Sequence, residues 1–596
     1  MSTAAYNRLL LLVAGLGGLL YGIDVGIIQG ALPYLTATSS FTPGQISFVV
    51  AAVLLGSVFS VLFAGLLADL LGRKTLMILT ALMFCASVPV IALSHGFAEL
   101  AGGRLLQGMS GGLVGVVVPL YLAESLGAGA RGKGTGIFQL LLVFGFVLSS
   151  LITLGFSHAL ASLAAHATAA QIFAFKNLAW RDTFWISLPF GILFVAGSFA
   201  LGESPRWLLR RGRRDAAESA LLRSRSKEQA RLELGEMETA IEQERARSRM
   251  RRAAESLLQR KYVAPFVLAC VILTCNQLTG VNSIIPYNTT ILLQAGLSDL
   301  QAHAGSFGFS IVNFILTIVA VLLVDRVGRK LLLTIGSAGI VLSMFAAGIL
   351  FHRSEARRVD VTPAVQRMVR ANQTLSLRFD AATARRLLRS AGTTAHGAES
   401  LVVNYAYGDF SGATNAVRSD EVTQPIAIAR DVPGNRVQAL LAGSSSPFGN
   451  IAAARTAPLR IVSAYVTPVP SAANGWLVAA ALYLFMAFFA VGPGVVVWLA
   501  LSELMPTRIR SNGMSIALFL NQGTSTTIAA IFLPTVAKHG YAGMFFAFSA
   551  FSVLYFIAAA FFLPETKGKR LEEIEGLFAA APPGRVPPQI AQDGSR

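Results

Sequence analysis

The chain has 596 residues, of which 54% are hydrophobic and only 13% are charged, and its formal net charge is +18. Soluble domains carry roughly 25% charged residues, so this composition excludes an ordinary soluble domain and indicates a membrane protein. Its cysteines, Cys85, Cys270 and Cys275, all lie in apolar segments, which argues against a disulfide framework and against a zinc site.

Long apolar segments predict membrane-spanning helices along most of the chain. A span needs about 20 apolar residues, and twelve segments satisfy this requirement. The first six lie near 8–33, 46–68, 75–95, 98–122, 135–156 and 183–201. The second six lie near 263–294, 303–324, 331–351, 475–501, 512–536 and 542–563. We therefore expect an all-α membrane protein with two six-helix halves.

Two further segments are too polar to span a membrane. Residues 204–261 are dense in Arg and Glu with apolar residues at helical spacing, which predicts a helical linker. Residues 352–473 have many Arg but no Lys, and contain β-like runs such as 401–407. This insert is either a small domain or a partly disordered decoration. The expected boundaries are 1–203, 204–261, 262–351, 352–473, 474–566 and a tail at 567–596.

The distribution of basic residues predicts the orientation in the membrane. Lys and Arg gather in the short loops on the side of the N-terminus, whereas the opposite loops 34–45 and 295–302 contain neither residue. By the positive-inside rule both termini are cytoplasmic, and the insert between the ninth and tenth spans is external. The positive net charge is then explained by the membrane topology, and it does not indicate that the protein binds nucleic acid.

A hexapeptide of the form Asp-x-x-Gly-Arg-Lys occurs twice, at Asp69–Lys74 and at Asp325–Lys330. Each copy lies between two apolar segments, which suggests two related membrane halves of the kind found in transporters.

Other charged residues flank the same ends of the spans, with Glu124 seven residues before Arg131 and Glu503 seven before Arg510. A network of these charges would lock the two halves in one state and release them in the other; the alternative is simple anchoring by positive charge. The candidate gate residues are Asp69, Arg73, Glu124, Arg131, Glu203, Arg206, Asp325, Arg329, Glu503, Arg510 and Glu565.

With these motifs in order, the chain resembles the sugar porter family of the major facilitator superfamily over nearly all of 8–570 except the insert. The resemblance rests on the two hexapeptides and on a set of further motifs. These are Gly102-Gly-Arg104, Glu124…Arg131-Gly132, Glu203-Ser-Pro-Arg206-Trp207, Asn276-Gln277-Leu-Thr-Gly280-Val-Asn282, Gly492-Pro-Gly494…Trp498, Ser502-Glu503 and Pro564-Glu-Thr-Lys-Gly568.

Asp24 lies within an otherwise apolar span, where a charge costs roughly 2.5–3.5 kcal/mol and should face a cavity and a partner. At about 1.5 Å per residue, Arg104 lies at a similar depth on the fourth span. Proton-coupled members of the family have Asp at this position, so the resemblance implies proton coupling through Asp24 and Arg104. The alternative is a permanent structural ion pair.

A sugar site needs amides for the hydroxyl groups and an aromatic surface for the ring face. Buried amides would otherwise form interhelical hydrogen bonds, which is the alternative interpretation of each one. The resemblance implies substrate binding by Gln139, Asn276, Gln277, Asn282, Asn313, Trp498 and Asn521, with Asn276 replacing the first of a usual glutamine pair. It also implies gating by Tyr287, which follows Pro286 where the family commonly has two tyrosines.

The resemblance implies a proton-coupled symporter for a hexose or pentose that works by alternating access in the cell (inner) membrane. A facilitative uniporter and a polyol or inositol carrier remain open, and a sugar sensor is less favoured. We expect a monomer whose partners are sugar, proton and lipid. No His cluster, nucleophile elbow or phosphate loop appears, so we expect neither an enzyme nor a cofactor.

Overall fold

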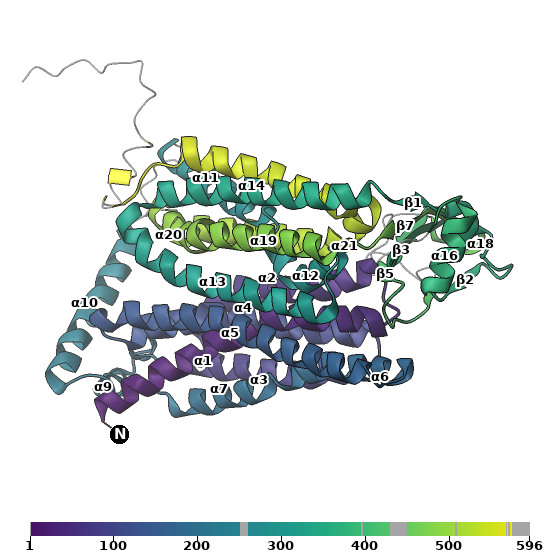
Figure 1. Cartoon of the computed structure of the whole chain (residues 1–596). Coiled ribbons are helices and arrows are strands. Elements are labelled where there is room, and N and C mark those ends of the chain that lie inside the picture. Colours follow the sequence, from purple (N-terminus) through teal and green to yellow (C-terminus); the bar gives the residue numbers. More distant parts are fainter. Residues whose placement is uncertain are drawn as a thin grey trace, which may run out of the picture.

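The computed structural model describes residues 2–250, 260–394, 397–429, 450–506 and 509–567, together with 569, 573, 574 and 578. Long helices form a bundle, with shorter helices at the end that carries the N-terminus and strands at the opposite end (Figure 1). We call these two ends the N-terminal end and the insert end.

The helices before the linker are called the N half. They are α1 (Thr3–Thr38), α2 (Pro43–Leu71), α3 (Arg73–Ala92), α4 (Phe97–Ser125), α5 (Ala128–Ala164), α6 (Ala169–Trp185) and α7 (Leu188–Ala200). A reciprocal capping box between Thr168 and Gln171 starts α6, and Ala169–Ala200 is apolar enough to be one span. The predicted start of the sixth span at 183 was therefore wrong, because Lys176 and Arg181 interrupt the apolar pattern within this helix.

The helices after the linker are called the C half. They are α11 (Arg260–Leu278), α12 (Val281–Gln294), α13 (Asp299–Val327), α14 (Arg329–Glu355), α19 (Ala472–Phe489), η1 (Ala490–Gly494), α20 (Val495–Leu504), α21 (Arg510–Ile557) and η2 (Ala558–Phe562). Gly280 separates α11 from α12 with φ of 85°, and the π-helical η1 around Pro493 separates α19 from α20. Both breaks fall inside predicted spans and redirect side chains there.

Among the described residues, eleven helical segments are long and apolar enough to cross a membrane, against twelve predicted. The last segment, Gly513–Phe562, covers two predicted spans and contains Gly540 with φ of 80° and ψ of 171°. A continuous helix of 48 residues would be about 72 Å long, far more than the hydrocarbon core of about 30 Å. The chain therefore turns back at Gly540.

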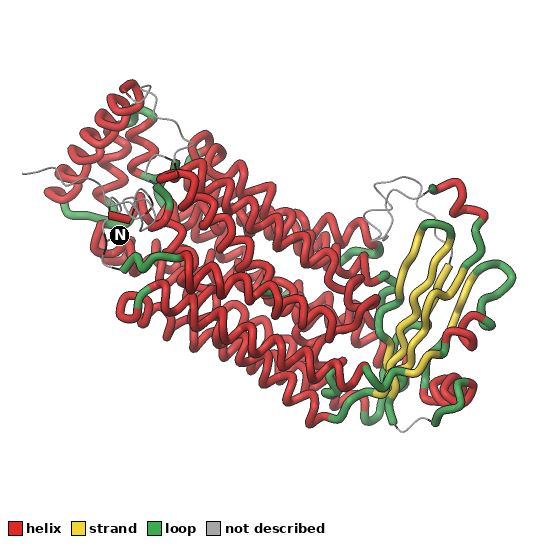
Figure 2. The backbone as a smooth tube through the Cα atoms, turned by 90° about the horizontal axis from the view of Figure 1, so that it is seen from above, coloured by secondary structure: helices red, strands yellow, loops and turns green. Residues whose placement is uncertain are grey.

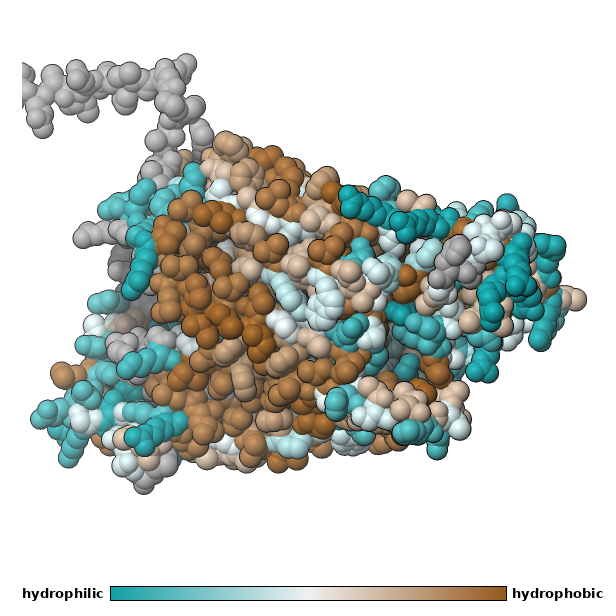
Figure 3. All heavy atoms as spheres, in the orientation of Figure 1, coloured by the Kyte–Doolittle hydropathy of each residue, from teal (hydrophilic) through white to brown (hydrophobic). Residues whose placement is uncertain are grey.

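The bundle has the surface of a membrane protein. On the face that Figure 3 shows, an apolar band crosses the middle of the bundle, and hydrophilic residues gather at the N-terminal end and over the insert. Large apolar side chains are exposed on the helices of the bundle, among them Leu66, Leu322, Leu342 and Phe551. Such a continuous apolar surface is stable against lipid and not in water.

The linker forms helices at the N-terminal end. These are α8 (Pro205–Arg210), α9 (Arg214–Leu222) and α10 (Lys227–Met250). Leu208, Leu221 and Leu234 share a small apolar core, and Trp207 Nε1 donates a hydrogen bond to the carbonyl oxygen of Asp69 at 2.9 Å. The linker is thus attached to the N half, while residues 251–259 of its predicted range lie outside the described residues.

The insert contains strands, so the all-α prediction was wrong for this part of the chain. Its elements are β1 (Val359–Asp360), α15 (Thr362–Gln366), β2 (Thr374–Leu377), α16 (Ala381–Ser390), β3 (Glu399–Tyr407), β4 (Phe410–Ala413), β5 (Val417–Arg418), β6 (Ile426–Ala429), α18 (Ile451–Thr456) and β7 (Arg460–Pro468). The antiparallel order is β1-β7-β3-β4, with β5 beside β3 and β2 beside β6 (Figure 2). The β-like run at 401–407 lies in β3.

The insert has an apolar core of its own. Leu401 of β3 pairs with Val466 of β7, and both side chains pack with Phe410 and Val365 in a cluster separate from the core of the bundle. Of the two interpretations left open by the sequence, the described residues of the insert take the form of a small domain.

Candidate functional site

The two opposite charges predicted to pair lie together inside the N half. Asp24 Oδ1 of α1 and Arg104 Nη1 of α4 are 3.6 Å apart, and each residue is only 1% exposed. Gly111 of α4 permits this approach, because a Cβ atom there would lie 3.0 Å from Asp24 Oδ2. The predicted contact is therefore confirmed; its role in coupling is a separate question.

The polar atoms of this pair are only partly satisfied. Within the described residues, neither carboxylate oxygen of Asp24 accepts a hydrogen bond, and Arg104 Nε donates none. Arg104 Nη1 instead donates to Gln107 Oε1 at 2.6 Å, and the guanidinium lies 5.6 Å from the ring centre of Phe184. Arg104 thus has an alternative neutral partner, whereas the Asp24 carboxylate has an ion pair without a hydrogen bond.

Three of the predicted amides meet in the C half. Gln277 Nε2 donates to Asn521 Oδ1 at 3.1 Å, and Asn282 Nδ2 donates to Gln277 Oε1 at 2.8 Å and to Ser525 Oγ at 2.7 Å. The break at Gly280 turns the chain between Gln277 and Asn282, so that both side chains reach the same point. This cluster joins α11, α12 and α21 through groups that can both donate and accept hydrogen bonds.

The other predicted binding residues are not joined to this cluster by any hydrogen bond among the described residues. In the part of the chain that the structure describes, Asn276 Oδ1 is buried without a hydrogen-bond partner, and Asn313 accepts only from Thr317 of its own helix, at 3.4 Å. Gln139 is half-buried on α5, a helix that contacts the α13 helix of Asn313. Trp498 on α20 is 43% exposed.

The first hexapeptide forms a network of charges at the N-terminal end. Arg73 Nε lies 2.9 Å from Glu124 Oε2, and Arg73 Nη1 lies 2.9 Å from Asp69 Oδ1. Glu203 accepts hydrogen bonds from the backbone N–H groups of Arg73 and Lys74, at 2.9 and 3.1 Å. Glu203 therefore caps the N-terminus of α3, where a negative charge is favoured by the helix dipole.

The second hexapeptide repeats this arrangement in the C half. Arg329 Nη2 lies 3.1 Å from Glu503 Oε1, and Glu565 accepts from the backbone N–H groups of Arg329 and Lys330 at 3.1 and 3.2 Å. Burial raises the pKa of Glu565. Hydrogen bonds from the backbone N–H groups of Lys567, Arg329 and Lys330 lower it by more than burial raises it, so the pKa of Glu565 lies below its usual value.

Within the described residues, these ion pairs join helices of the same half and not helices of different halves. Glu124 pairs with Arg73 and Glu503 with Arg329, so the arginine of each hexapeptide meets a glutamate at the end of a neighbouring helix. The side chains of Arg131, Asp325 and Arg510 lie outside the described residues.

Arg206, also predicted as a gate residue, is exposed, and the described residues give its side chain no hydrogen bond or ion pair. Its position in the linker helix α8 leaves it beside the N half, and no contact with the C half is described.

The two halves meet directly at the insert end. The ring of Tyr287 on α12 stacks on Phe532 of α21, with centroids 4.6 Å apart, and its hydroxyl donates to Ser47 Oγ of α2 at 3.2 Å. Tyr34 of α1 donates to Asp299 Oδ2 of α13 at 2.9 Å. The only gate residue predicted from this end, Tyr287, therefore lies in a closed contact between halves.

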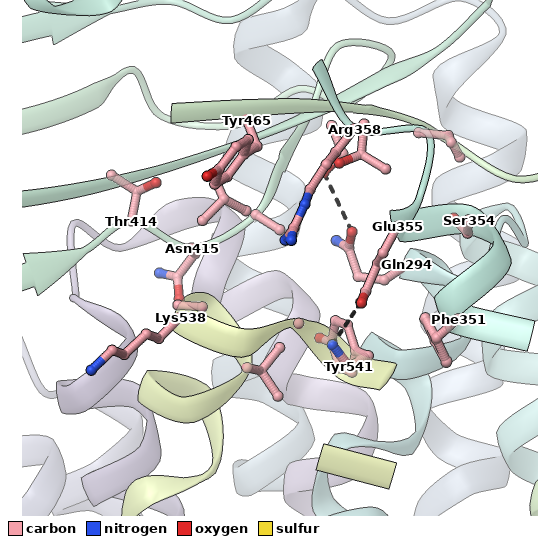
Figure 4. A pocket seen from close by; sticks show the side chains of 18 of the residues that line it. Gln294, Phe351, Ser354, Glu355, Arg358, Thr414, Asn415, Tyr465, Lys538 and Tyr541 are labelled. Atoms are coloured by element: carbon pink, nitrogen blue, oxygen red, sulfur yellow. Dashed lines mark hydrogen bonds between the residues drawn. The ribbon is translucent and has the colours of Figure 1, made fainter. Parts of the chain in front are cut away.

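A cavity of about 130 Å³ lies where the insert meets the helix ends (Figure 4). Glu355 at the end of α14 accepts from the backbone N–H of Tyr541 at 2.7 Å, and the guanidinium of Arg358 lies 4.8 Å from the ring centre of Tyr465. Asn415 of the insert lines the same cavity. Asn404 Nδ2 of β3 donates to the carbonyl oxygen of Ala537 of α21 at 3.3 Å, which attaches the insert to the helix ends.

Several residues of the site were not predicted. Gln107 follows Arg104 by three residues and therefore shares its helix face. Ser204 donates to Glu124 Oε2, and Thr566 donates to Glu503 Oε2 at 2.5 Å. Each of these two hydroxyls directly follows a capping glutamate, so a comparison of the repeated ends would have found the pair.

A profile of the family described as "Sugar (and other) transporter" matches residues 10–365 and 440–578. The chain is 27% identical over 569 residues to the facilitated glucose transporter member 12 of solute carrier family 2 from Xenopus laevis, covering 94% of this chain and 88% of that relative. It is 24% identical over 574 residues to the glucose transporter GlcP of Staphylococcus epidermidis, covering 96% and 97%. It is also 27% identical over 590 residues to the human proton myo-inositol cotransporter, covering 97% and 82%.

The fold is also found among solved structures. The inward-open conformation of the xylose transporter XylE from E. coli has a TM-score of 0.62 and 20% identity, covering 95% of this chain and 98% of that one. The helical bundle therefore has the major facilitator fold. Together with the family profile, this assigns the chain to the sugar porter family of the major facilitator superfamily.

Proposed function

We propose that the protein is a proton-coupled symporter for a monosaccharide, with twelve spans arranged as two six-helix halves that alternate around a central site. The observation that carries the coupling is the buried Asp24–Arg104 pair, in which the carboxylate accepts no hydrogen bond within the described residues. A charged side chain within a span is energetically costly, and an ionisable residue that is kept there is therefore a candidate functional residue.

The surroundings of Asp24 suggest how a proton would be loaded. Neither carboxylate oxygen has a hydrogen bond that protonation must break. When Asp24 is neutral, Arg104 keeps a partner in Gln107, whose Oε1 already lies 2.6 Å away. The two states of the pair are thus both supported, and a small movement of α1 against α4 would select between them.

Sugar binding is proposed at the amide cluster and at Trp498. A sugar hydroxyl both donates and accepts, as do the amides of Gln277, Asn282 and Asn521 that now bond to one another. Exchange of these mutual bonds for bonds to the sugar would keep the buried amides satisfied. The half-exposed ring of Trp498 would cover the apolar face of the sugar, and Gln139, Asn276 and Asn313 would complete the site.

With the N-terminal end assigned to the cytoplasm by the positive-inside rule, this conformation faces inward. Its halves are in contact at the insert end through Tyr287 and Ser47, whereas the described ion pairs of the hexapeptides at the other end stay within each half. Both termini are then cytoplasmic and the insert is external.

The test is uptake of labelled sugar into proteoliposomes with an acidic exterior. The wild-type protein should accumulate sugar above its external concentration, and a protonophore should abolish this accumulation. Asp24→Asn, which keeps size but cannot carry a charge, should lose accumulation while still exchanging internal for external sugar. Accumulation by Asp24→Asn at the wild-type level would refute coupling through this residue.

The same assay separates the alternatives. A facilitative uniporter would equilibrate sugar without exceeding the external concentration under any pH gradient. The substrate is tested with glucose, xylose and myo-inositol, because the similar proteins include transporters named for each of the three. Preference for myo-inositol would favour the polyol carrier over the monosaccharide symporter.

A further inference from the structure

The insert is joined covalently to the C half alone. It leaves the bundle at the end of α14 and returns at the start of α19, and both helices belong to the C half. Any conformational change that separates the halves at the insert end must therefore move the insert together with the C half. Contacts between the insert and the N half would have to break during that movement.

Such contacts are present. Asn415 Nδ2 donates to the carbonyl oxygen of Phe41 at 2.8 Å, in the connection between α1 and α2. Gln424 donates from its backbone N–H to the carbonyl oxygen of Ala37 and from Nε2 to that of Thr38, both at 3.1 Å.

A further contact comes from the N half itself. Lys176 of α6, which is buried, donates from Nζ to the carbonyl oxygen of Val422 at 3.3 Å. Together these bonds attach the insert loop 415–424 to the outer ends of α1, α2 and α6.

The same loop is fixed to the C half by Arg418. Its Nη1 donates to the carbonyl oxygens of Leu293 and Leu297 at 2.8 and 3.1 Å, at the C-terminal end of α12, where a cation is favoured by the helix dipole. Asp420 holds the guanidinium in place with two hydrogen bonds, at 2.9 and 2.7 Å. Arg418 is buried, and through its bonds the loop links the C half to the N half.

We propose that the insert loop 415–424 is an external latch, which stabilises the inward-facing conformation by bonding the N half to an insert carried by the C half. This inference rests on the proposed alternating access. The latch residues fall in 366–439, which the family profile leaves unmatched. The device would therefore belong to this chain's insert and not to the shared bundle.

The test compares two matched double variants. Asn415→Ala with Gln424→Ala removes side-chain bonds from the insert to the N half. The control, Asn404→Ala with Ser400→Ala, removes side-chain bonds from the insert to the C half, at Ala537 and Gln294. The control bonds do not cross between the halves, so their loss should leave the equilibrium between conformations unchanged.

The readout is the distance between spin labels on the two halves. Labels at Ala165→Cys and His539→Cys, both exposed positions near the insert end, are placed in a background without the native cysteines. Each hydrogen bond contributes enough to change an equilibrium about two- to tenfold. The latch variant should therefore raise the ratio of separated to closed insert ends by about fivefold or more.

An unchanged ratio in the latch variant, or an equal change in the control, would overturn the proposal. If the latch variant does not fold, Lys176→Met removes a latch bond from the N half side and should shift the ratio in the same direction; no shift would again overturn it. The distances are measured without sugar or a pH gradient. A failure of proton coupling would therefore leave this result intact, and a failure of the latch would leave coupling intact.

Discussion

The Asp24 carboxylate depends on Arg104, because within the described residues it accepts no hydrogen bond, whereas Arg104 has a second, neutral partner in Gln107. Removing one partner of a buried ion pair is strongly destabilising, by about 3–5 kcal/mol, because the other charge is left uncompensated, whereas neutralising both partners is often nearly neutral. Arg104→Gln should therefore lower thermal stability markedly, and Arg104→Gln combined with Asp24→Asn should recover much of it.

The measurement is thermal unfolding of the wild-type protein, the two single variants and the double variant in detergent. A coupling free energy above about 1 kcal/mol is expected between the two sites. Additive effects would contradict a direct ion pair, whatever the transport activity of the variants. Gln107→Leu is a further variant for this comparison, because it removes the neutral partner of Arg104. It should reduce proton-coupled sugar accumulation more than it reduces thermal stability.

At the scale of single residues, the sequence could predict the charges but not their neutral partners. Asp24 and Arg104 were identifiable because a charge within an apolar span needs a partner at the same depth, and helix rise gives the depth. Gln107 and Ser525 are uncharged, so they lack the free-energy cost within a span that would have identified them as needing a partner. Asn282 could be named as a candidate, but its contact with Gln277 depends on the turn at Gly280, a detail of backbone conformation.

The two hexapeptide turns place a glycine directly against a capping carboxylate. Gly72 has φ of 93° and Gly328 has φ of 100°, values that L side chains rarely adopt. A Cβ on Gly72 would overlap Glu203 Oε2, and one on Gly328 would lie 2.6 Å from Glu565 Oε2. Both glycines are therefore needed for the turn and for the cap of the following helix.

Gly72→Ala and Gly328→Ala should each destabilise the protein by about 1–3 kcal/mol and weaken transport. Gly65→Ala and Gly523→Ala are matched controls, because a Cβ at either position meets no atom within 4 Å, and alanine favours a helix over glycine. Thermal unfolding and initial uptake rates of the four variants provide the measurement. Equal stability of the turn variants and the controls would show that the turns tolerate a side chain.

At the scale of elements, the repeat predicted where the charged turns lie, but not which residues pair across them. Glu124 was identifiable as a charged residue at a helix end, but its partner Arg73 lies on another helix, 51 residues earlier in the chain. The insert shows the same limit. The run 401–407 was readable as a strand, but β3 pairs with β7, some 60 residues later, and such non-local pairing leaves no signal in a local pattern.

The whole molecule consists of a bundle and an insert that can be separated with little geometric cost. The insert begins with β1 and ends with β7, and these strands pair in antiparallel fashion, with Asp360 opposite Tyr465. Opposite residues in such a pair lie about 5 Å apart, so an Asn-Gly turn can close the chain across them. The apolar core of the insert is also separate from that of the bundle.

Replacing residues 361–464 by an Asn-Gly turn should therefore leave a folded, monodisperse bundle that still transports sugar. Because the excised segment carries the latch loop, spin labels at 165 and 539 should report a larger fraction of separated insert ends than in the full chain. Sugar entry from the insert side should begin from a more populated open state, which would lower the external sugar concentration needed for half-maximal uptake. A bundle that aggregates after excision would show that the insert is part of its fold, and a folded bundle with unchanged label distances would show that the insert does not influence the gate.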